Sequence, residues 1–220
     1  MGSLESVVGD TGVGKSWWWT REVMPSRARR GLCQLYHSPN RDDRPPMFEP
    51  MTLRELHRCR KVPRAIQLAH CTALEAIREA ERMAELWAME VALDEAHNVA
   101  PNYGETWQEE YTPEERQELR RWVLHLLRQG RHAPMDVAFL SPTIRGLHPE
   151  VWRFSRWTHY HLQSEPSDQR AIEERYGAFA ALQVSRLKPR ERISVKRGAP
   201  PEGWDGHQRL LAARAKRLGL

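Results

Sequence analysis

The feature that most constrains this chain is an eight-residue stretch near its start, Gly9-Asp10-Thr11-Gly12-Val13-Gly14-Lys15-Ser16. It fits the pattern G-x-x-x-x-G-K-S and stands between an apolar run at 4–8, which predicts a strand, and a segment that can be helical. Glycines at these places let successive backbone N–H groups turn toward phosphate oxygens, and Lys15 adds a positive charge beside the β- and γ-phosphates. The alternative is a glycine-rich turn that matches by accident, which the strand context and the Lys-Ser pair disfavour. The stretch predicts a nucleoside triphosphate site.

The residues that end this phosphate loop extend the prediction. The Ser16 hydroxyl can ligate Mg²⁺, and the helix that starts there points its positive dipole end at the anion. Three consecutive tryptophans, 17–19, cannot share one face of a helix. We expect at least one of them in the core and one or two, with Trp17 nearest the loop, at the nucleotide base or a neighbouring subunit. The helix is predicted to reach about Met24 and to stop at Pro25.

A second motif follows about eighty residues later. The apolar run 91–93 leads into Asp94 and Glu95, as a strand that ends in two acids. Asp94, at the carboxyl end of the strand, is predicted to hold Mg²⁺ through water. Glu95 is then placed to orient and deprotonate the attacking water as a general base. The alternative is a strand that ends in two solvated acids. With the phosphate loop present, the pair predicts an ATPase that uses ATP and Mg²⁺.

The rest of the chain predicts strands that alternate with helices. Strands are expected at 31–36, 65–69, 137–141, 157–162 and 192–196, and helices at 52–56, 72–89, 112–129, 166–176, 178–187 and 208–218. Residues 41–50 and 98–112 are expected to be loops. This alternation predicts an α/β fold, a single P-loop NTPase domain with a mostly parallel central sheet flanked by helices, and a nucleotide at the carboxyl ends of the strands.

Composition places limits on domain number and on partners. A chain of 220 residues with 40% hydrophobic residues allows one domain with a small appendage, and no run is long enough for an integral membrane segment. We divide it into an ATPase core at 1–187 and a basic C-terminal extension at 188–220.

The net charge of +5 is unevenly distributed, since the residues from Arg186 onward include ten Lys or Arg against three Asp or Glu. The stretch 21–64 is also basic, and such segments suit a polyanion such as DNA. A solvated arginine-rich surface is the alternative.

The segment from Leu126 onward resembles the FtsK/HerA superfamily of DNA-pumping ATPases. Members follow the Asp-Glu strand with a helix, a Gly-Arg pair and a strand ending in Thr-Gln-Arg-Pro. Here Gly130-Arg131 and the strand 137–141 with Ser141-Pro142-Thr143 take those places, and the resemblance covers residues 1 to about 187. It implies a RecA-like (ASCE) core and a ring-shaped homo-oligomer, expected to be a hexamer. It also implies an arginine that reaches the neighbour's ATP, with Arg131 the first candidate and Arg128 the second; a surface arginine or a structural ion pair is the alternative for each.

The chain departs from the family pattern at the polar residue that senses the γ-phosphate. The position of the family's glutamine is taken here by Pro142, whose side chain cannot contact a γ-phosphate. The resemblance therefore leaves Ser141 or Thr143 as the substitute sensor.

The size of the chain narrows the resemblance. A bare ATPase core of this length looks like the genome-packaging ATPases of membrane-containing double-stranded DNA viruses. That resemblance implies an ATP-hydrolysing translocase of double-stranded DNA, without sequence specificity, that docks on a capsid or portal vertex protein. It places the protein in the host cytoplasm or at the packaging vertex of the virion.

Two other functions fit the same residues. One is an ATP-dependent DNA-binding loader or recombination factor that does not pump. The other is a nucleotide-switched structural protein of the virion without turnover, for which Pro142 would mark lost hydrolysis; intact Lys15, Ser16, Asp94 and Glu95 oppose it.

Overall fold

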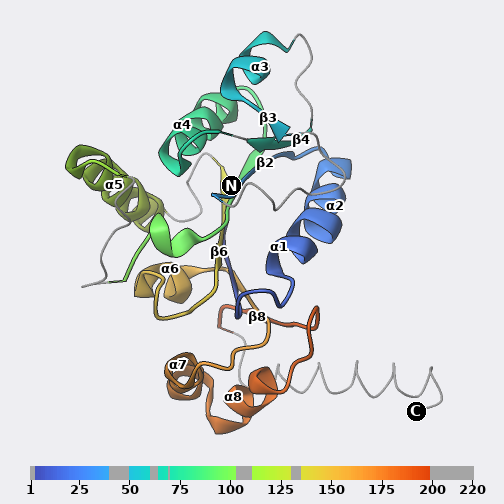
Figure 1. Ribbon diagram of the computed structural model, residues 1–220, viewed down its shortest axis with the longest axis vertical. Helices are drawn as coiled ribbons and strands as arrows, with labels where there is room; N and C mark the ends of the chain where they lie inside the picture. The colour runs from blue at the N-terminus through green and yellow to red at the C-terminus, as the bar shows by residue number, and fades with distance from the viewer. Residues whose placement is uncertain are drawn as a thin grey trace, which may run out of the picture.

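In the computed structural model, residues 3–39, 50–59, 64–68, 70–102, 111–129 and 135–198 are described. Their strands form one mixed sheet in the order β3-β4-β2-β5-β6-β1-β7-β8, in which every neighbouring pair is parallel except β7 and β8 (Figure 1). The strands are β1 Leu4–Val8, β2 Cys33–His37, β3 Pro50–Met51, β4 Ala65–Leu68, β5 Met89–Leu93, β6 Asp136–Ser141, β7 Trp157–Tyr160 and β8 Ile193–Lys196. The predicted α/β fold with a mostly parallel sheet is confirmed.

Helices cover both faces of this sheet. They are α1 Lys15–Trp18, the π-helical turn η1 Trp19–Val23, α2 Met24–Arg29, α3 Leu53–Arg58, α4 Ala73–Ala84, the 3₁₀ turn η2 Ala96–Asn98, α5 Pro113–Gln129, α6 Pro149–Phe154, α7 Pro166–Tyr176 and α8 Ala178–Ser185. Among the described residues, no helix is both long and apolar enough to cross a membrane.

The alternation of side chains along the buried strands builds a core on each face. In β6, Val137 and Phe139 join the cluster under α3, α4, α5 and α6, whereas Ala138 and Leu140 join the cluster under α1, η1 and α2. A third cluster packs α7 and α8 against the β7–β8 end of the sheet. Strands buried on both faces need such helical cover, which is why the sequence reads as short apolar runs separated by amphipathic helices.

Helix starts follow their local signals. Thr52 with Glu55 and Thr72 with Glu75 each form a capping box at the start of α3 and α4. The same hydrogen bonds join Thr112 and Glu115 at the start of α5. Each box satisfies backbone N–H groups that the first helical turn leaves without partners.

Two predicted helix ends are wrong. The first helix does not stop at Pro25, since α2 continues through it to Arg29. The π-helical turn immediately before this proline widens the helix, and a widened turn accommodates a ring that would clash with the preceding turn of a regular α-helix. The helix predicted over 72–89 ends at Ala84, because Met89 already belongs to β5 and Leu86, at 66% exposed, lies outside the apolar stripe.

Besides the 3₁₀ turn η2, two short elements were not predicted from the sequence. Residues 50–51, expected as the end of a loop, add the edge strand β3. Helix α6 starts at Pro149, where the His148 ring accepts a hydrogen bond from the Glu150 N–H. A six-residue helix and a two-residue strand are too short for hydrophobic periodicity to indicate.

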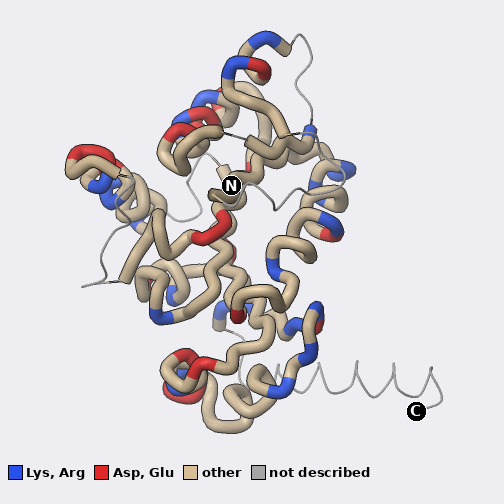
Figure 2. Tube along the Cα trace, viewed as in Figure 1, with Lys and Arg blue, Asp and Glu red and all other residues tan. Residues whose placement is uncertain are grey.

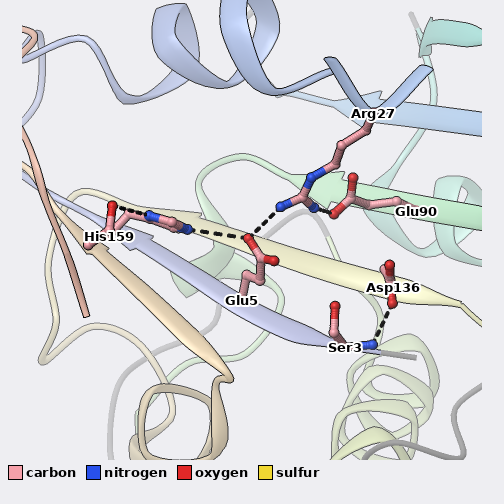
Figure 3. Close-up of polar contacts among 7 residues, drawn as sticks. Ser3, Glu5, Arg27, Glu90, Asp136 and His159 are labelled. Carbon is pink, nitrogen blue, oxygen red and sulfur yellow. Dashed lines mark hydrogen bonds and ion pairs between the residues drawn. The ribbon is translucent and has the colours of Figure 1, made fainter. Parts of the chain in front are cut away.

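Figure 3 shows a charged cluster buried between the sheet and α2. The Arg27 guanidinium donates to Glu5 on β1 at 2.8 Å and to Glu90 on β5. His159 on β7 contacts Glu5 at 3.3 Å and Ser194 on β8 at 2.8 Å. Burial raises the pKa of Glu5, but the hydrogen bond from His159 and the Arg27 charge outweigh it and hold that pKa below its usual value. One arginine thus bridges two buried carboxylates on different strands.

Replacing Arg27 by methionine is expected to lower the free energy of unfolding by about 3–5 kcal/mol, because both carboxylates stay buried without their cation. Urea unfolding followed by circular dichroism measures the change. The exposed pair Arg78–Glu118 supplies the control, since Arg78→Met should lose less than about 1 kcal/mol. Adding Glu5→Gln and Glu90→Gln to Arg27→Met should recover part of the loss; an Arg27→Met loss no larger than that of Arg78→Met would contradict the assignment.

Candidate nucleotide-binding site

The predicted phosphate loop connects β1 to α1 at the carboxyl edge of the sheet. Gly12 and Gly14 have φ values of 81° and 100°, a region in which side chains other than glycine are strained. Gly9 is required for a different reason, since a Cβ there would lie 2.5 Å from the His161 Cβ. Thr11 and Gly12 are exposed at the tip of the loop, whereas Val13 is buried beneath it. The glycines therefore permit both the turn and its close contact with His161, the residue that follows β7.

The Lys15 side chain lies inside this loop. Its Nζ donates to the backbone carbonyls of Gly9 at 2.6 Å and Asp10 at 2.9 Å, and the residue is 7% exposed. The Asp10 carboxylate accepts from the Ser164 N–H at 2.9 Å, which fastens the loop to the segment after β7. The ammonium is thereby held within the turn of the loop, where the motif predicts that phosphates bind.

Ser16 and Asp94 meet across the sheet. The Ser16 hydroxyl donates to Asp94 Oδ2 at 2.5 Å, and the Tyr36 hydroxyl on β2 donates to the same oxygen at 2.6 Å. Asp94 follows β5 directly and is 4% exposed. The structure thus brings together the two predicted Mg²⁺ residues, which are seventy-eight positions apart in the chain.

Glu95 occupies a left-handed backbone conformation, with a φ of 51° and a ψ of 43°. Its N–H donates to Asp94 Oδ1 at 3.0 Å, and one carboxylate oxygen lies 3.4 Å from Nδ1 of His97. Burial lowers the pKa of His97, and Lys15 adds to this effect while Asp94 opposes it. A non-glycine residue in this conformation is strained, and such strain is concentrated at functional sites. The strained turn thus places Glu95 next to Asp94 at the carboxyl end of β5.

The two tentative sensor residues use their hydroxyls inside the turn after β6. Ser141 is fully buried, and its Oγ donates to the Thr143 carbonyl at 2.7 Å. The Thr143 hydroxyl accepts from the Gly146 N–H at 3.0 Å. The Ser141 carbonyl accepts from the Gly9 N–H at 3.3 Å, so the end of β6 touches the phosphate loop. Both residues lie near the site, and their sensor role stays a prediction.

The arginine candidates are placed differently by the structure. Arg131, like the Gly130 before it, lies outside the described residues, and so do residues 199–220 with the predicted terminal helix. Arg128 is exposed in the last turn of α5. Of the tryptophans, Trp18 and Trp19 are buried in the core, and Trp17 is 39% exposed.

Three polar residues at this edge were missed by the sequence analysis. Tyr36 contacts Asp94, as described above. Gln163, fully buried and with its amide oriented to suit its neighbours, accepts from the Gly9 N–H at 2.7 Å and donates to Asp168 at 2.9 Å. Asp168 also accepts from the N–H groups of Ile144 and Arg145, each at 3.0 Å; burial raises its pKa, and these backbone hydrogen bonds oppose the rise. Polar residues at the carboxyl ends of predicted parallel strands were the available signal.

His161 lies directly beneath the loop and is fully buried. Burial lowers its pKa to about 3, and the charges of Lys15 and Arg192 contribute to that shift. The His161 ring is therefore neutral in the folded protein near neutral pH.

Comparison with known proteins gives similar structures without a similar sequence. No protein-family profile and no curated protein sequence matches the chain. The genome packaging NTPase B204 from Sulfolobus turreted icosahedral virus 2, in complex with ATP-gammaS, has a TM-score of 0.65 at 18% identity over 90% of this chain and 93% of that one. B204 from Sulfolobus turreted icosahedral virus, named as a DNA-packaging ATPase, has a TM-score of 0.64 at 17% identity over 89% and 92%.

A conjugation coupling protein is also similar. TcpA of pCW3, in a monomer form with ATPgS, has a TM-score of 0.58 at 13% identity over 90% of this chain and 58% of that one. At these identities the similarity establishes the fold, an α/β P-loop NTPase domain.

The buried neutral His161 predicts a loss of stability in mild acid. Between the ordinary histidine pKa of 6.5 and the folded value of about 3, the unfolded chain binds a proton that the folded chain does not. Stability therefore falls as the pH decreases through this window. From pH 7.5 to 5.5 this one group accounts for about 1.4 kcal/mol.

Urea unfolding at the two pH values tests this effect. His161→Leu should reduce the difference by that amount, whereas His125→Gln, at an exposed position of α5, should leave it unchanged. An identical pH dependence in His161→Leu and the unchanged protein would refute the explanation.

Proposed function

We propose that this chain hydrolyses ATP and couples the hydrolysis to translocation of double-stranded DNA, as a genome-packaging motor. The observation that carries the proposal is the Ser16–Asp94 contact of 2.5 Å, with Glu95 next in the chain. This contact connects the predicted phosphate loop to the buried carboxylate of Asp94. The Glu95 carboxylate lies beside them, with 23% of its side chain exposed. Each of these parts belongs to phosphoryl transfer to water.

The residues present fit a magnesium ion. Mg²⁺ prefers hard oxygen ligands, and the site offers a hydroxyl and a carboxylate already in contact. Ser16 and Asp94 would hold the ion, directly and through water, and the ion would supply positive charge against the β- and γ-phosphates. The Tyr36 hydroxyl donates a second hydrogen bond to Asp94 Oδ2 and helps to hold it in place.

The other steps of ATP hydrolysis are assigned to side chains and backbone groups of this chain. Lys15 and the loop N–H groups bind the phosphates and counter the charge that develops during transfer. Glu95 orients the attacking water and accepts its proton, and the strained turn fixes the direction of its carboxylate. Thr143 or Ser141 would sense the γ-phosphate from the end of β6.

The role in DNA packaging rests on two supports. The fold is similar to that of B204, which is itself named as a DNA-packaging ATPase. Basic residues also gather along the segment from the end of α8 to the residue after β8 (Figure 2): Arg186, Lys188, Arg190, Arg192, Lys196 and Arg197. Positive charge of this density binds DNA phosphates through counterion release, without sequence preference.

The assembled form follows from the same proposal. The chains form a ring, expected to be a hexamer, in which Arg131, or else Arg128, reaches the ATP of the neighbouring subunit. The ring docks on a capsid or portal vertex protein, in the host cytoplasm or at the vertex of the virion.

Steady-state ATP hydrolysis, with and without long linear duplex DNA, tests the proposal. Glu95→Gln should keep ATP binding and lose at least a hundredfold in turnover, because the amide cannot accept the proton of the attacking water. Lys15→Ala should lose binding as well. Duplex DNA should raise the turnover of the unchanged protein.

The competing functions give different results in these assays. ATP binding with turnover no higher than that of Lys15→Ala would favour a nucleotide-switched structural protein. Turnover that rises with DNA, without displacement of a roadblock bound to the duplex, would favour a loader.

Tyr36→Phe tests the proposed Mg²⁺ site. Removal of the hydroxyl should raise the Mg²⁺ concentration for half-maximal ATP hydrolysis about tenfold, since a residue that holds a metal ligand tunes the affinity for the metal. Tyr160→Phe is the matched control, because Tyr160 is equally buried and its hydroxyl accepts from Trp152. An equal Mg²⁺ requirement in both variants would remove Tyr36 from the site.

A further inference from the structure

The segment between α8 and β8 folds back onto the phosphate loop. The Arg190 N–H donates to the Val13 carbonyl at 2.8 Å, and Arg190 itself adopts a left-handed conformation with a φ of 69°. A Cβ placed on Gly14 would lie 3.2 Å from the Arg190 Cγ. The backbone and the side chain of Arg190 are thus both held against the loop, although the sequence places them 175 residues beyond Lys15.

The side chain of Arg190 ends over Trp17. Its guanidinium carbon lies 4.6 Å from the centroid of the Trp17 ring, within the range of a cation–π contact. Trp17 is the residue directly after Ser16, and it keeps 39% of its surface exposed. Trp18 and Trp19 supply the core packing on this helix, at 5% and 0% exposed. Burial in the core therefore does not account for a large aromatic ring at position 17.

We propose that Trp17 and Arg190 form the base-binding end of the nucleotide site. The inference rests on the proposed function, because it assumes that the loop binds the phosphates of ATP. A base is joined to the phosphate chain through the ribose, so it must come to rest on a surface that borders the loop. The exposed part of the Trp17 indole is such a surface, and aromatic stacking on a base is strong and tolerant of base identity.

Arg190 acts in this site as a positioning residue. The hydrogen bond to Val13 fixes its backbone to the loop, and its guanidinium lies over the Trp17 ring, which limits the movement of the indole. A ring fixed in this way loses less side-chain freedom when a base binds, which favours binding. The first residues of the basic C-terminal extension thereby contribute to the nucleotide site.

The experiment compares two ligands that share phosphates and differ in the base. Calorimetric titration with Mg²⁺ measures the affinity for the non-hydrolysable analogue AMP-PNP and for inorganic tripolyphosphate. Trp17→Ala should weaken AMP-PNP binding about tenfold and leave tripolyphosphate binding unchanged. Trp17→Phe, which keeps an aromatic face, should recover most of the affinity. Arg190→Gln should weaken AMP-PNP binding about threefold, again without effect on tripolyphosphate.

Matched controls come from the opposite edge of the sheet. Trp87 is 41% exposed just before β5, and Trp87→Ala should change neither affinity. Arg197 lies just after β8, where its guanidinium carbon is 5.0 Å from the Phe154 ring centroid, and Arg197→Gln should likewise change neither.

The outcomes separate this inference from the proposed function. Equal losses of affinity for both ligands in Trp17→Ala and Arg190→Gln would mean that these residues shape the phosphate loop. An unchanged AMP-PNP affinity would mean that the base binds elsewhere. Either result overturns the inference. Lys15→Ala should lose both ligands, and if it keeps both, the proposed nucleotide site itself fails. Thermal unfolding identifies any variant that does not fold, and Arg190→Gln, at an exposed position, then decides the question.

Discussion

The contact between the Ser16 hydroxyl and the Asp94 carboxylate depends on strand order. Ser16 follows β1 and Asp94 follows β5, and these strands are separated in the sheet by β6. All three run parallel, so their carboxyl ends lie at one edge, and a serine and an aspartate from distant parts of the chain meet there. The end of β6 completes this edge, because its Ser141 carbonyl accepts a hydrogen bond from the Gly9 N–H.

Buried ion pairs connect β1 and β5 a few residues before the ends of these strands. Arg27, from the helix that follows the phosphate loop, joins Glu5 on β1 to Glu90 on β5. A buried ion cluster contributes little net stability compared with apolar packing, but it is strongly unfavourable when one member is missing. It therefore disfavours arrangements in which β1, β5 and α2 are not brought together. The cluster holds β1 through Glu5, and the phosphate loop begins where this strand ends.

Local signals in the sequence were sufficient for much of the fold and for naming the residues that meet at the centre of the candidate site. The phosphate loop, Asp94 and Glu95 were predictable because backbone and side-chain chemistry is concentrated in consecutive residues. The helix start at Thr112 was predictable because capping depends on four adjacent positions. Continuation of the helix through Pro25 was not, because a π-helical turn has no pattern that local propensity detects.

Contacts between distant segments were not predicted from the sequence. Tyr36 reaches Asp94, Gln163 reaches Gly9 and Arg190 reaches Trp17 only through the order of the strands. A sequence without aligned relatives does not contain that order. Polar residues at the ends of predicted strands would have been a useful guide, since the carboxyl edge of a parallel sheet is where such side chains gather.

The two borders of the sheet, as far as the structure describes them, bear on how copies of the chain associate. One border is β3, only two residues long, and the other is β8, whose outward residues Ser194 and Lys196 are polar or charged. Short or lysine-bearing border strands resist backbone pairing with another sheet. The proposed ring should therefore assemble through side chains on helices and loops, so that subunits can shift against one another without breaking a shared ladder of backbone hydrogen bonds.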